Sequence, residues 1–345
     1  MQRRIRPGRG VLWSQDCPGV VEARPRRVGT ALSISSAPPL HQRALLELQV
    51  PVDGTSPRVS IGVPVYNGER FLRETLDSLV RQTFKDCEII VSDNASTDGT
   101  AEICKTYARA DGRIRYVKND INLGSARNFN QTLDLARGDY FKSASADDLC
   151  EPDLVEKCVS VLDTMPEVVL CYARSVLIDE RGTPIRPYDD NLNLREASAA
   201  ERFRKAIERV RMVNVLQGVV RTAALRKTGK LGTYRGSDMV LAPEIALYGQ
   251  IYELPERLFF RRIHPGAFSS LGSAEHEQEF VNPGVRQASG YYARHFREYV
   301  QAVWRAPLER GDRIRLLSWI LRRAIAARGE LWRETLASLA AVLRQ

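Results

Sequence analysis

Two adjacent carboxylates, Asp147 and Asp148, are the residues most suited to bind a divalent cation. They follow a short run of strand-forming residues, 140–145, and precede a predicted helix with Pro152 near its first turn. Carboxylate oxygens suit Mg²⁺ and Mn²⁺, and two buried like charges without a cation would be costly. An acidic pair at this kind of junction can also serve only as a helix cap. By themselves the two aspartates leave both interpretations open.

Asp93 is a second carboxylate at the end of a predicted strand, and it could accept hydrogen bonds from a base or a ribose. Alternatively it is only a turn residue, and the following Ser96, Thr97 and Asp98 suit capping of the next helix. Two further polar turns, 64–67 and 122–124, occupy the same kind of position.

The elements that position these residues alternate between short β-branched runs and helical stretches, which is typical of βαβ units and a mostly parallel sheet. The predicted strands are 59–65, 87–93, 114–118, 140–145, 168–178 and 254–263. The predicted helices are 69–82, 99–110, 125–136, 152–164, 199–211, 222–228 and 238–248. In such sheets ligands bind at the carboxyl ends of the strands. We therefore expect the polar residues at those ends to form one site.

The bulk composition is that of a soluble protein of 345 residues with a formal net charge of +9. The excess charge lies in residues 1–58 and 274–345, and the intervening residues sum to zero. No run approaches the roughly 18 apolar residues of a membrane span, and no signal peptide is recognisable. The six cysteines form no C-x-x-C pair. These features predict a cytoplasmic protein with free thiols and no nucleic-acid partner.

A series of segments between Val59 and Pro152 resembles, in order and spacing, the nucleotide-binding half of family 2 glycosyltransferases with the GT-A fold. The matching segments are 63–68, 78–84, 90–100, 122–128, 136–140 and 145–148. The resemblance implies an α/β protein with a Rossmann-like, mostly parallel sheet flanked by helices. It also implies a domain over 58–270, with a nucleotide-sugar-binding half (58–152) and an acceptor half (153–270). We expect residues 1–57 to be a disordered leader and 271–345 a C-terminal amphipathic helical extension.

The resemblance also implies roles for individual residues. Asp147 would bind Mn²⁺ or Mg²⁺ bridging the donor phosphates. The expected nucleotide-sugar-binding residues are Pro64, Tyr66, Asn67, Asp93, Asn122, Asp147 and Asp148. The acidic motif of the family is often Asp-x-Asp, whereas here Ser145 takes the place of the first acid. The division of labour between the two aspartates is therefore open.

The second half resembles the family's acceptor side more loosely. An inverting transfer needs a carboxylate that takes the proton of the acceptor hydroxyl, and Asp238 is the candidate, with a helix cap as the alternative. His264 would reach the metal or the diphosphate, although it can equally be a loop residue beside Pro-Gly. Arg262 could offset phosphate charge. Asn214 and Gly218 resemble an acceptor-side loop.

Two amphipathic helices are predicted over 311–344. Their apolar stripes consist of Ile314, Leu317, Leu321 and Ile325, and of Trp332, Leu336, Leu339 and Leu343. The stripes either pack on the catalytic domain or a sister subunit as a homodimer, or they lie peripherally on an anionic membrane.

Together these features predict an inverting transfer of a sugar, with a UDP sugar favoured, to a hydroxyl of a polysaccharide or lipid-linked acceptor. A sugar-phosphate nucleotidyltransferase would need a Gly-rich phosphate loop after the first strand, and 65–70 lacks it. A dinucleotide oxidoreductase is disfavoured by the lack of G-x-G-x-x-G. Ser145 leaves open a non-catalytic nucleotide-sugar-binding protein on the same scaffold.

Overall fold

A computed structural model describes residues 56–267, 270, 273–285 and 290–333. The predicted leader therefore lies outside the described residues except for its last two positions. The second predicted stripe is described only at Trp332, since its three leucines also lie outside. The domain boundaries expected from the sequence remain predictions.

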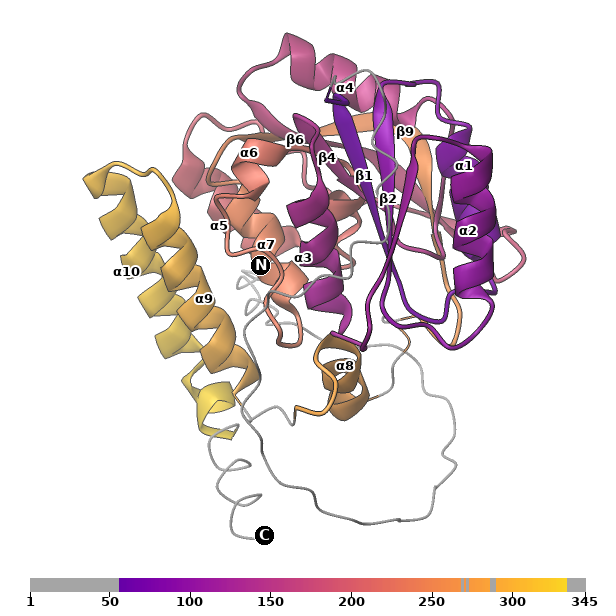
Figure 1. Ribbon diagram of the computed structural model, residues 1–345. Helices are drawn as coiled ribbons and strands as arrows, with labels where there is room; N and C mark the ends of the chain where they lie inside the picture. The colour runs from indigo at the N-terminus through magenta and orange to yellow at the C-terminus, as the bar shows by residue number, and fades with distance from the viewer. Residues whose placement is uncertain (1–55, 268–269, 271–272, 286–289, 334–345) are drawn as a thin grey trace, which may run out of the picture. The chain divides into compact units, whose positions relative to one another are not determined.

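One mixed sheet organises the described residues (Figure 1). Its first four strands are parallel and run in the order β3-β2-β1-β4, with bounds Ile114–Lys118, Cys87–Asp93, Val59–Val65 and Tyr140–Ser143. The sheet continues in the order β8-β6-β9-β5, with bounds Val219–Arg221, Val168–Ile178, Gln250–Arg262 and Leu149–Cys150. β9 is parallel to β6, whereas β8 and β5 are antiparallel to their neighbours. β7 (Pro184–Tyr188) pairs with β6 in a hairpin.

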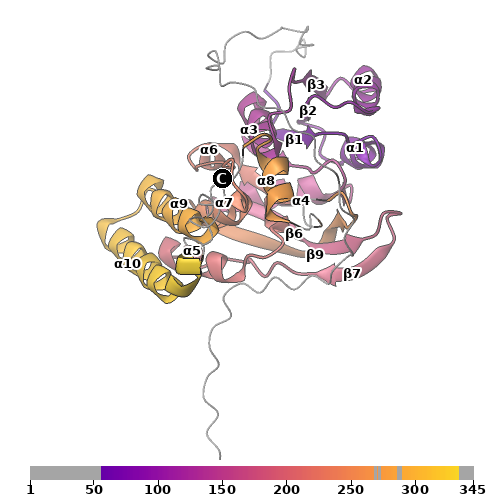
Figure 2. The same cartoon turned by 90° about the horizontal axis from the view of Figure 1, so that it is seen from below.

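Helices cover both faces of this sheet (Figures 1 and 2). Val59, Ile61 and Val63 of β1 share one core with α1 (Leu72–Val80), α2 (Thr100–Ala110) and α4 (Leu154–Thr164). The intervening Gly62 faces α3 (Ser125–Leu135), where a Cβ would meet the Thr132 hydroxyl at 2.4 Å. Successive strand residues point to opposite faces, so the two layers follow from the alternation of β1.

A second core lies between the helices of the C-terminal half. α5 (Ala199–Arg209) and α7 (Ser237–Ile245) pack against α9 (Tyr291–Arg305) and α10 (Arg310–Ala326). Phe203, Tyr299 and Val303 are among its buried residues. The remaining short elements are η1 (Asn214–Gln217), α6 (Thr222–Leu225) and α8 (Ala274–Val281). None of the helices in the described ranges combines the length and apolarity needed to cross a membrane.

The α/β fold predicted from the sequence is confirmed, and most strands of the first half have the predicted bounds. β5, β7, β8, η1, α8 and α9 were not predicted as individual elements. β5 and β8 have two and three residues, too few to show a periodic pattern. The predicted stripe is divided in the structure: Leu317 packs against the second core, whereas Ile314, Leu321 and Ile325 are exposed. Leu316 and Ile320, which were not part of the predicted stripe, are buried in that core. Contact of the exposed members with a sister subunit or a membrane stays a prediction.

Candidate active site

A cavity of about 920 Å³ opens at the carboxyl ends of β1 and β4. Its lining includes ten residues singled out in the sequence, namely Pro64, Tyr66, Asn67, Asn122, Ser145, Asp147, Asp148, Asp238, Arg262 and His264. These residues come from both halves of the chain, so β9 and α7 must be in place before the site is complete.

Asp147 and His264 lie side by side in this cavity. Asp147 Oδ2 is 3.0 Å from His264 Nε2, and the side chains are 29% and 12% exposed. The His264 ring packs on Phe71 of the loop after β1, with ring centroids 4.8 Å apart. A carboxylate and an imidazole, supplied by elements distant in sequence, therefore face the cavity together.

Asp148 is the more deeply buried member of the pair. Its Oδ1 accepts the backbone N–H of Arg262 at 2.8 Å, which ties the loop after β4 to the end of β9. Burial raises the pKa of the Asp148 carboxyl, and the neighbouring Asp147 charge adds to this rise. The carboxylate of Asp148 is thus held by a backbone N–H, whereas that of Asp147 is hydrogen-bonded to the His264 side chain instead.

Asp93 does not line the cavity. It is fully buried, with Oδ1 bound by the backbone N–H of Ser96 and Oδ2 bound by the Tyr116 hydroxyl at 2.7 Å. Both oxygens thus shape the turn after β2. The expected nucleotide contact of Asp93 stays a prediction.

The cavity wall beside β2 contains asparagines that the sequence analysis did not single out. Asn94 Nδ2 donates to Asn122 Oδ1 at 2.6 Å, and Asn128 Nδ2 donates to the Ser92 carbonyl. Asn94 and Asn128 both line the cavity. Asn67 is held in the left-handed region at φ 50° while its Oδ1 accepts from the Thr97 backbone N–H. These bonds fix amide groups at the strand ends where a planar base could lie.

Asp238 lies in the first turn of α7 and also lines the cavity. Its Oδ1 accepts the backbone N–H of the next residue, Met239, at 2.9 Å, whereas the N-cap of α7 is Gly236. Burial raises the pKa of its carboxyl, while the N–H bond and the Arg261 guanidinium oppose that rise. Asp238 is therefore not the N-cap of α7, and its role as a base stays a prediction.

Two neighbouring arginines on β9 have different environments. The Arg262 side chain is fully buried, donates to the Asp147 carbonyl at 2.8 Å and forms an ion pair with Glu74 at 2.6 Å. Arg262 is therefore already neutralised by protein groups, which argues against the expected phosphate role. Arg261 instead contacts the acceptor half, donating to the Met212 carbonyl and to Asn214 Oδ1. No pattern in the sequence singles out Arg261 as the half-buried cation of this wall.

Asn214 and Gly218, the two residues expected in an acceptor-side loop, do not line the cavity themselves, although their neighbours do. Asn214 is 2% exposed and is not a lining residue, and at Gly218 a Cβ would meet the Cys171 carbonyl at 2.4 Å. The residues of this loop that do line the cavity are Met212, Val213, Leu216 and Gln217. Val213 has φ 59°, a conformation that β-branched residues rarely adopt.

Gln217 connects this loop to the loop that bears Asp147. Its Nε2 donates to Ser145 Oγ at 3.1 Å, and its carbonyl accepts from the buried Lys142 ammonium at 2.5 Å. Ser145, the departure from the family's acidic motif, is thus half-buried and bound to a neutral amide. The serine contributes to positioning without adding negative charge.

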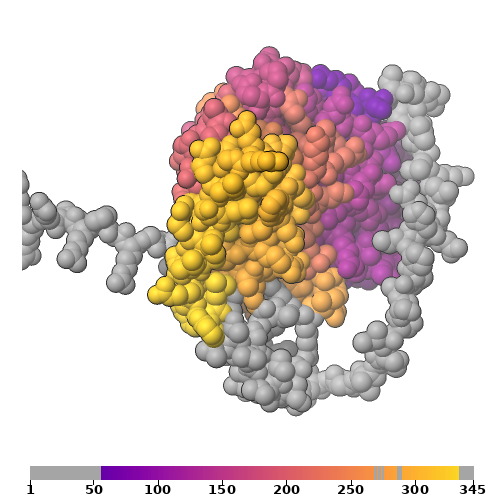
Figure 3. All heavy atoms as spheres, turned by 90° about the vertical axis from the view of Figure 1, so that its left-hand side faces the viewer, coloured from indigo at the N-terminus to yellow at the C-terminus, as the bar shows by residue number. Residues whose placement is uncertain are grey.

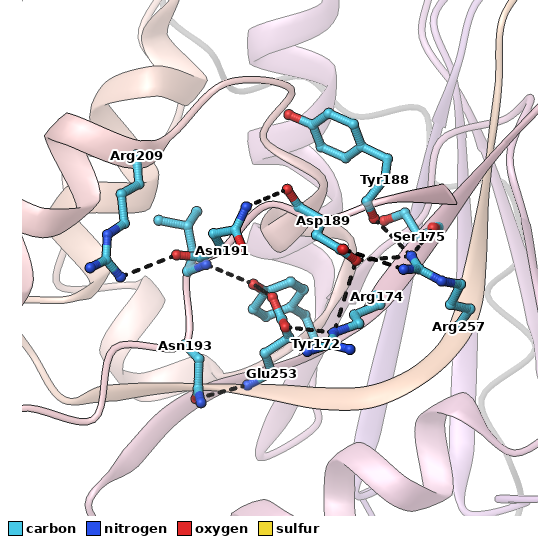
Figure 4. Close-up of polar contacts among 11 residues, drawn as sticks. Tyr172, Arg174, Ser175, Tyr188, Asp189, Asn191, Asn193, Arg209, Glu253 and Arg257 are labelled. Atoms are coloured by element: carbon cyan, nitrogen blue, oxygen red, sulfur yellow. Dashed lines mark hydrogen bonds and ion pairs between the residues drawn. The ribbon is translucent and has the colours of Figure 1, made fainter. Parts of the chain in front are cut away.

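A polar network holds the segment between β7 and α5 against the sheet (Figure 4). Arg257 donates to the carbonyls of Ser175 and Tyr188 and pairs with Asp189 at 2.9 Å. Tyr172 accepts the backbone N–H of Leu192 at 3.0 Å. This anchoring supports the wall formed by 212–217.

Two residues of the cavity have donor atoms of the kinds that divalent cations bind. In the described part of the chain no group of three or more His, Cys, Asp or Glu residues could hold a metal by itself. Asp147 and His264 nonetheless offer two ligands that face the cavity, and Mn²⁺ accepts both oxygen and imidazole donors.

Comparison with known proteins agrees with this geometry. Residues 60–228 match the profile of glycosyl transferase family 2. This segment belongs to that family. A putative glycosyltransferase EpsE of Bacillus subtilis is 36% identical over 137 residues, covering 39% of this chain and 49% of the relative. An uncharacterized glycosyltransferase of Methanocaldococcus jannaschii is 34% identical over 134 residues, covering 38% and 46%. The chain thus spans about half the length of these curated relatives.

The fold of the chain is also similar to that of solved structures. S. aureus TarS 1-349 superimposes with a TM-score of 0.56 at 18% identity, covering 78% of this chain and 72% of TarS. The same protein in complex with UDP-GlcNAc gives a TM-score of 0.55, with 78% and 73% covered. The GT-A fold expected from the sequence is confirmed.

Proposed function

We propose that this chain transfers a sugar from a nucleoside diphosphate to a hydroxyl of a glycan or lipid-linked acceptor, with inversion at the anomeric carbon. The observation that carries the proposal is that Asp147, His264 and Asp238 line one cavity, together with the strand ends of the nucleotide half. Membership of the 60–228 segment in glycosyl transferase family 2 supports it.

The nucleotide would lie along the ends of β1 and β2, beside Tyr66, Asn67 and the Asn94–Asn122 pair. Tyr66 is 46% exposed and offers a ring face on which a base can stack. The diphosphate would then reach the start of α3, where the unpaired N–H groups of a helix N-terminus favour anions. Ser125 and Ala126 of that first turn line the cavity.

Asp147 and His264 would hold Mn²⁺ or Mg²⁺ at the diphosphate end of the cavity. When bound, such a cation neutralises the charge on the departing nucleoside diphosphate. Asp148 would keep the loop that contains Asp147 in place through its hydrogen bond to the backbone of Arg262 on β9. The ring of Phe71 packs against the His264 imidazole and would fix its orientation.

On the acceptor side, Asp238 would take the proton of the attacking hydroxyl. The acceptor oxygen forms the new bond to the anomeric carbon as the bond from that carbon to the diphosphate breaks. The acceptor oxygen would attack from the side of the sugar opposite to the departing diphosphate, so the configuration would invert. The positive charge of Arg261 would favour the ionised form of Asp238, because it opposes the rise that burial causes in that carboxyl's pKa.

The test is the release of nucleoside diphosphate by the full chain from a panel of UDP, GDP and dTDP sugars, with Mn²⁺ or EDTA and candidate acceptors. UDP sugars come first because TarS, which shares the fold, was solved with UDP-GlcNAc. We expect Asp147→Asn to lower kcat by roughly 10²-fold or more, because the variant would bind the cation less well. The negative charge that develops on the leaving diphosphate in the transition state would then not be neutralised. Unchanged turnover of Asp147→Asn, or full activity in EDTA, would contradict the metal assignment.

Asp238→Asn is the matched variant, with the same isosteric change on the acceptor side. It should lose transfer while retaining donor affinity measured by calorimetry. Pyrophosphate release from a nucleoside triphosphate and a sugar phosphate would instead indicate a nucleotidyltransferase. Donor binding without any turnover across the panel would indicate a binding protein.

A further inference from the structure

The outer face of α10 carries large aliphatic side chains that no described element covers. Ile314, Leu321 and Ile325 are 65%, 60% and 53% exposed. At 100° per residue these three positions fall within about 40° of arc on the helix. Leu316 and Ile320 form the face that is buried in the second core. α10 therefore has two apolar faces, and packing uses only one of them.

This exposed stripe, defined by Ile314, Leu321 and Ile325, belongs to a helix at the surface. Figure 3, which shows the left-hand side of Figure 1, has α10 in yellow at the front. Trp304, at the end of α9, is 60% exposed, and the Arg313 guanidinium lies 5.4 Å from its ring centroid. Contiguous exposed apolar groups of this kind mark interaction surfaces.

The charges around the exposed stripe are almost all positive. α10 has five arginines and one acidic residue, Asp312, which pairs with Arg315 at 2.8 Å. Arg310 and Arg322 lie on the two sides of the stripe by helical geometry. Neither has a hydrogen-bond or ion-pair partner among the described residues. Arginine stems can lie along an apolar surface while their guanidinium groups reach polar groups at its edge.

We propose that the exposed stripe of α10 docks on an anionic lipid surface. The aliphatic side chains would enter the boundary between headgroups and acyl chains, and Arg310 and Arg322 would bind the headgroup phosphates. A second copy of this chain fits less well. An isologous contact would bring the same arginines together, and α10 has no acidic residue beside the stripe to pair with them.

The docking surface is independent of the proposed transfer chemistry, because none of its residues lines the cavity. It would nevertheless bring the domain to the surface in which a lipid-linked acceptor lies. The failure of one proposal can therefore be told from the failure of the other.

The experiment is co-sedimentation of the full chain with vesicles of phosphatidylcholine, alone or mixed with phosphatidylglycerol. We expect at least about tenfold tighter binding to the anionic vesicles, weakened by added salt. The double variant Leu321→Glu, Ile325→Glu should lose about tenfold or more of that binding. Ile185→Glu on β7, where the side chain is 54% exposed, is the matched control and should bind like the parent chain.

A second variant, Arg310→Ser with Arg322→Ser, tests the charge separately and should lose the preference for anionic vesicles. Circular dichroism and nucleoside diphosphate release in solution verify that each variant is folded. Equal sedimentation of the parent chain and the glutamate variant would overturn the proposal. So would a dimer, measured by light scattering, that the glutamate variant dissociates while no form binds vesicles, because that result assigns the stripe to a second copy.

Discussion

The carboxyl group of Asp190 is buried without a hydrogen-bond partner near the loop 212–217, which lines the cavity. It is 3% exposed, and neither oxygen has a partner among the described residues. Asn214 Nδ2, also buried, lacks a partner as well. Burial raises the pKa of Asp190 to about 7, although the Arg261 charge and Asn214 partly oppose this. A carboxyl in this environment folds more readily as the neutral acid.

This environment makes the stability of the domain depend on pH. The unfolded Asp190 carboxyl ionises near the ordinary aspartate pKa of 3.8, whereas the folded one retains its proton up to about 7. Unfolding therefore releases a proton in that window, and the contribution of Asp190 to stability falls as pH rises from about 4 to 7. Asp190→Asn should match the parent chain near pH 4 and be more stable by on the order of 2–4 kcal/mol at pH 8.

Urea unfolding at several pH values measures this difference. Asp189→Asn is the control, because the neighbouring Asp189 is half-exposed and pairs with Arg257 in the network of Figure 4, so its loss should bring no gain at pH 8. Unfolding free energies of Asp190→Asn and the parent chain that stay parallel from pH 4 to pH 8 would refute the assignment.

The residue types of the site could be predicted from the sequence, but their environments could not. Asp147, Asp238 and His264 are recognisable because they lie at the ends of predicted elements, where a resemblance can be matched position by position. Arg261 and Arg262 are identical in type and adjacent. Only the pairing of β9 with β6 decides which guanidinium is buried with Glu74 and which contacts Asn214.

At the level of elements, α8 closes one side of the cavity over the start of α3. His276, Phe280 and Val281 of α8 are lining residues. Gly124, which precedes α3, has φ +81°, and a Cβ there would meet the Val281 carbonyl at 2.2 Å. The absence of a side chain at Gly124 is therefore what allows the two helices to approach.

Gly124→Ala should separate α8 from α3 and weaken the site. The strained φ and the clash should lower the unfolding free energy by about 1–3 kcal/mol and reduce donor affinity measured by calorimetry. Gly112→Ala is the control, because nothing lies within 4 Å of a Cβ there and its φ is not positive. Equal donor affinity of Gly124→Ala and the parent chain would show that α8 does not shape the donor site.

The regular elements of the nucleotide half were predictable because its strands are short runs rich in β-branched or aromatic residues and its helices each have one apolar face. α8 was not, since its sequence AEHEQEFV has few apolar residues to repeat at helical spacing. The outward orientation of the predicted α10 stripe also could not be foreseen, because Leu316 and Ile320 offer a competing apolar face. Tertiary packing, not local pattern, chooses between two such faces.

On the scale of the whole described chain, the C-terminal helices are part of the folded domain. Leu316 and Ile320 of α10 join Phe203 and Tyr299 in one core, and Arg305 of α9 forms an ion pair with the buried Glu244 at 2.8 Å. Removal of α9 and α10 would therefore expose the second core.

Leu316→Ala should lower the unfolding free energy by about 2–4 kcal/mol, because it leaves a cavity in that core. Leu321→Ala, the same change five residues along the helix, should alter it by less than about 0.5 kcal/mol, since Leu321 is 60% exposed. Urea denaturation of both variants measures the two values. Equal losses would mean that the two faces of α10 do not differ in burial.

The hydrogen bond between Asp147 and His264 joins positions 117 residues apart. A ribosome has released the entire nucleotide half, with its four parallel strands, well before His264 is synthesised. During that interval the early strands can pair, but the loop bearing Asp147 has neither β9 beside it nor an imidazole to face. Contacts of such long sequence separation form late, because a long loop must be closed first. The site should thus be assembled by the last strand of the sheet, and truncated nascent chains should not contain it.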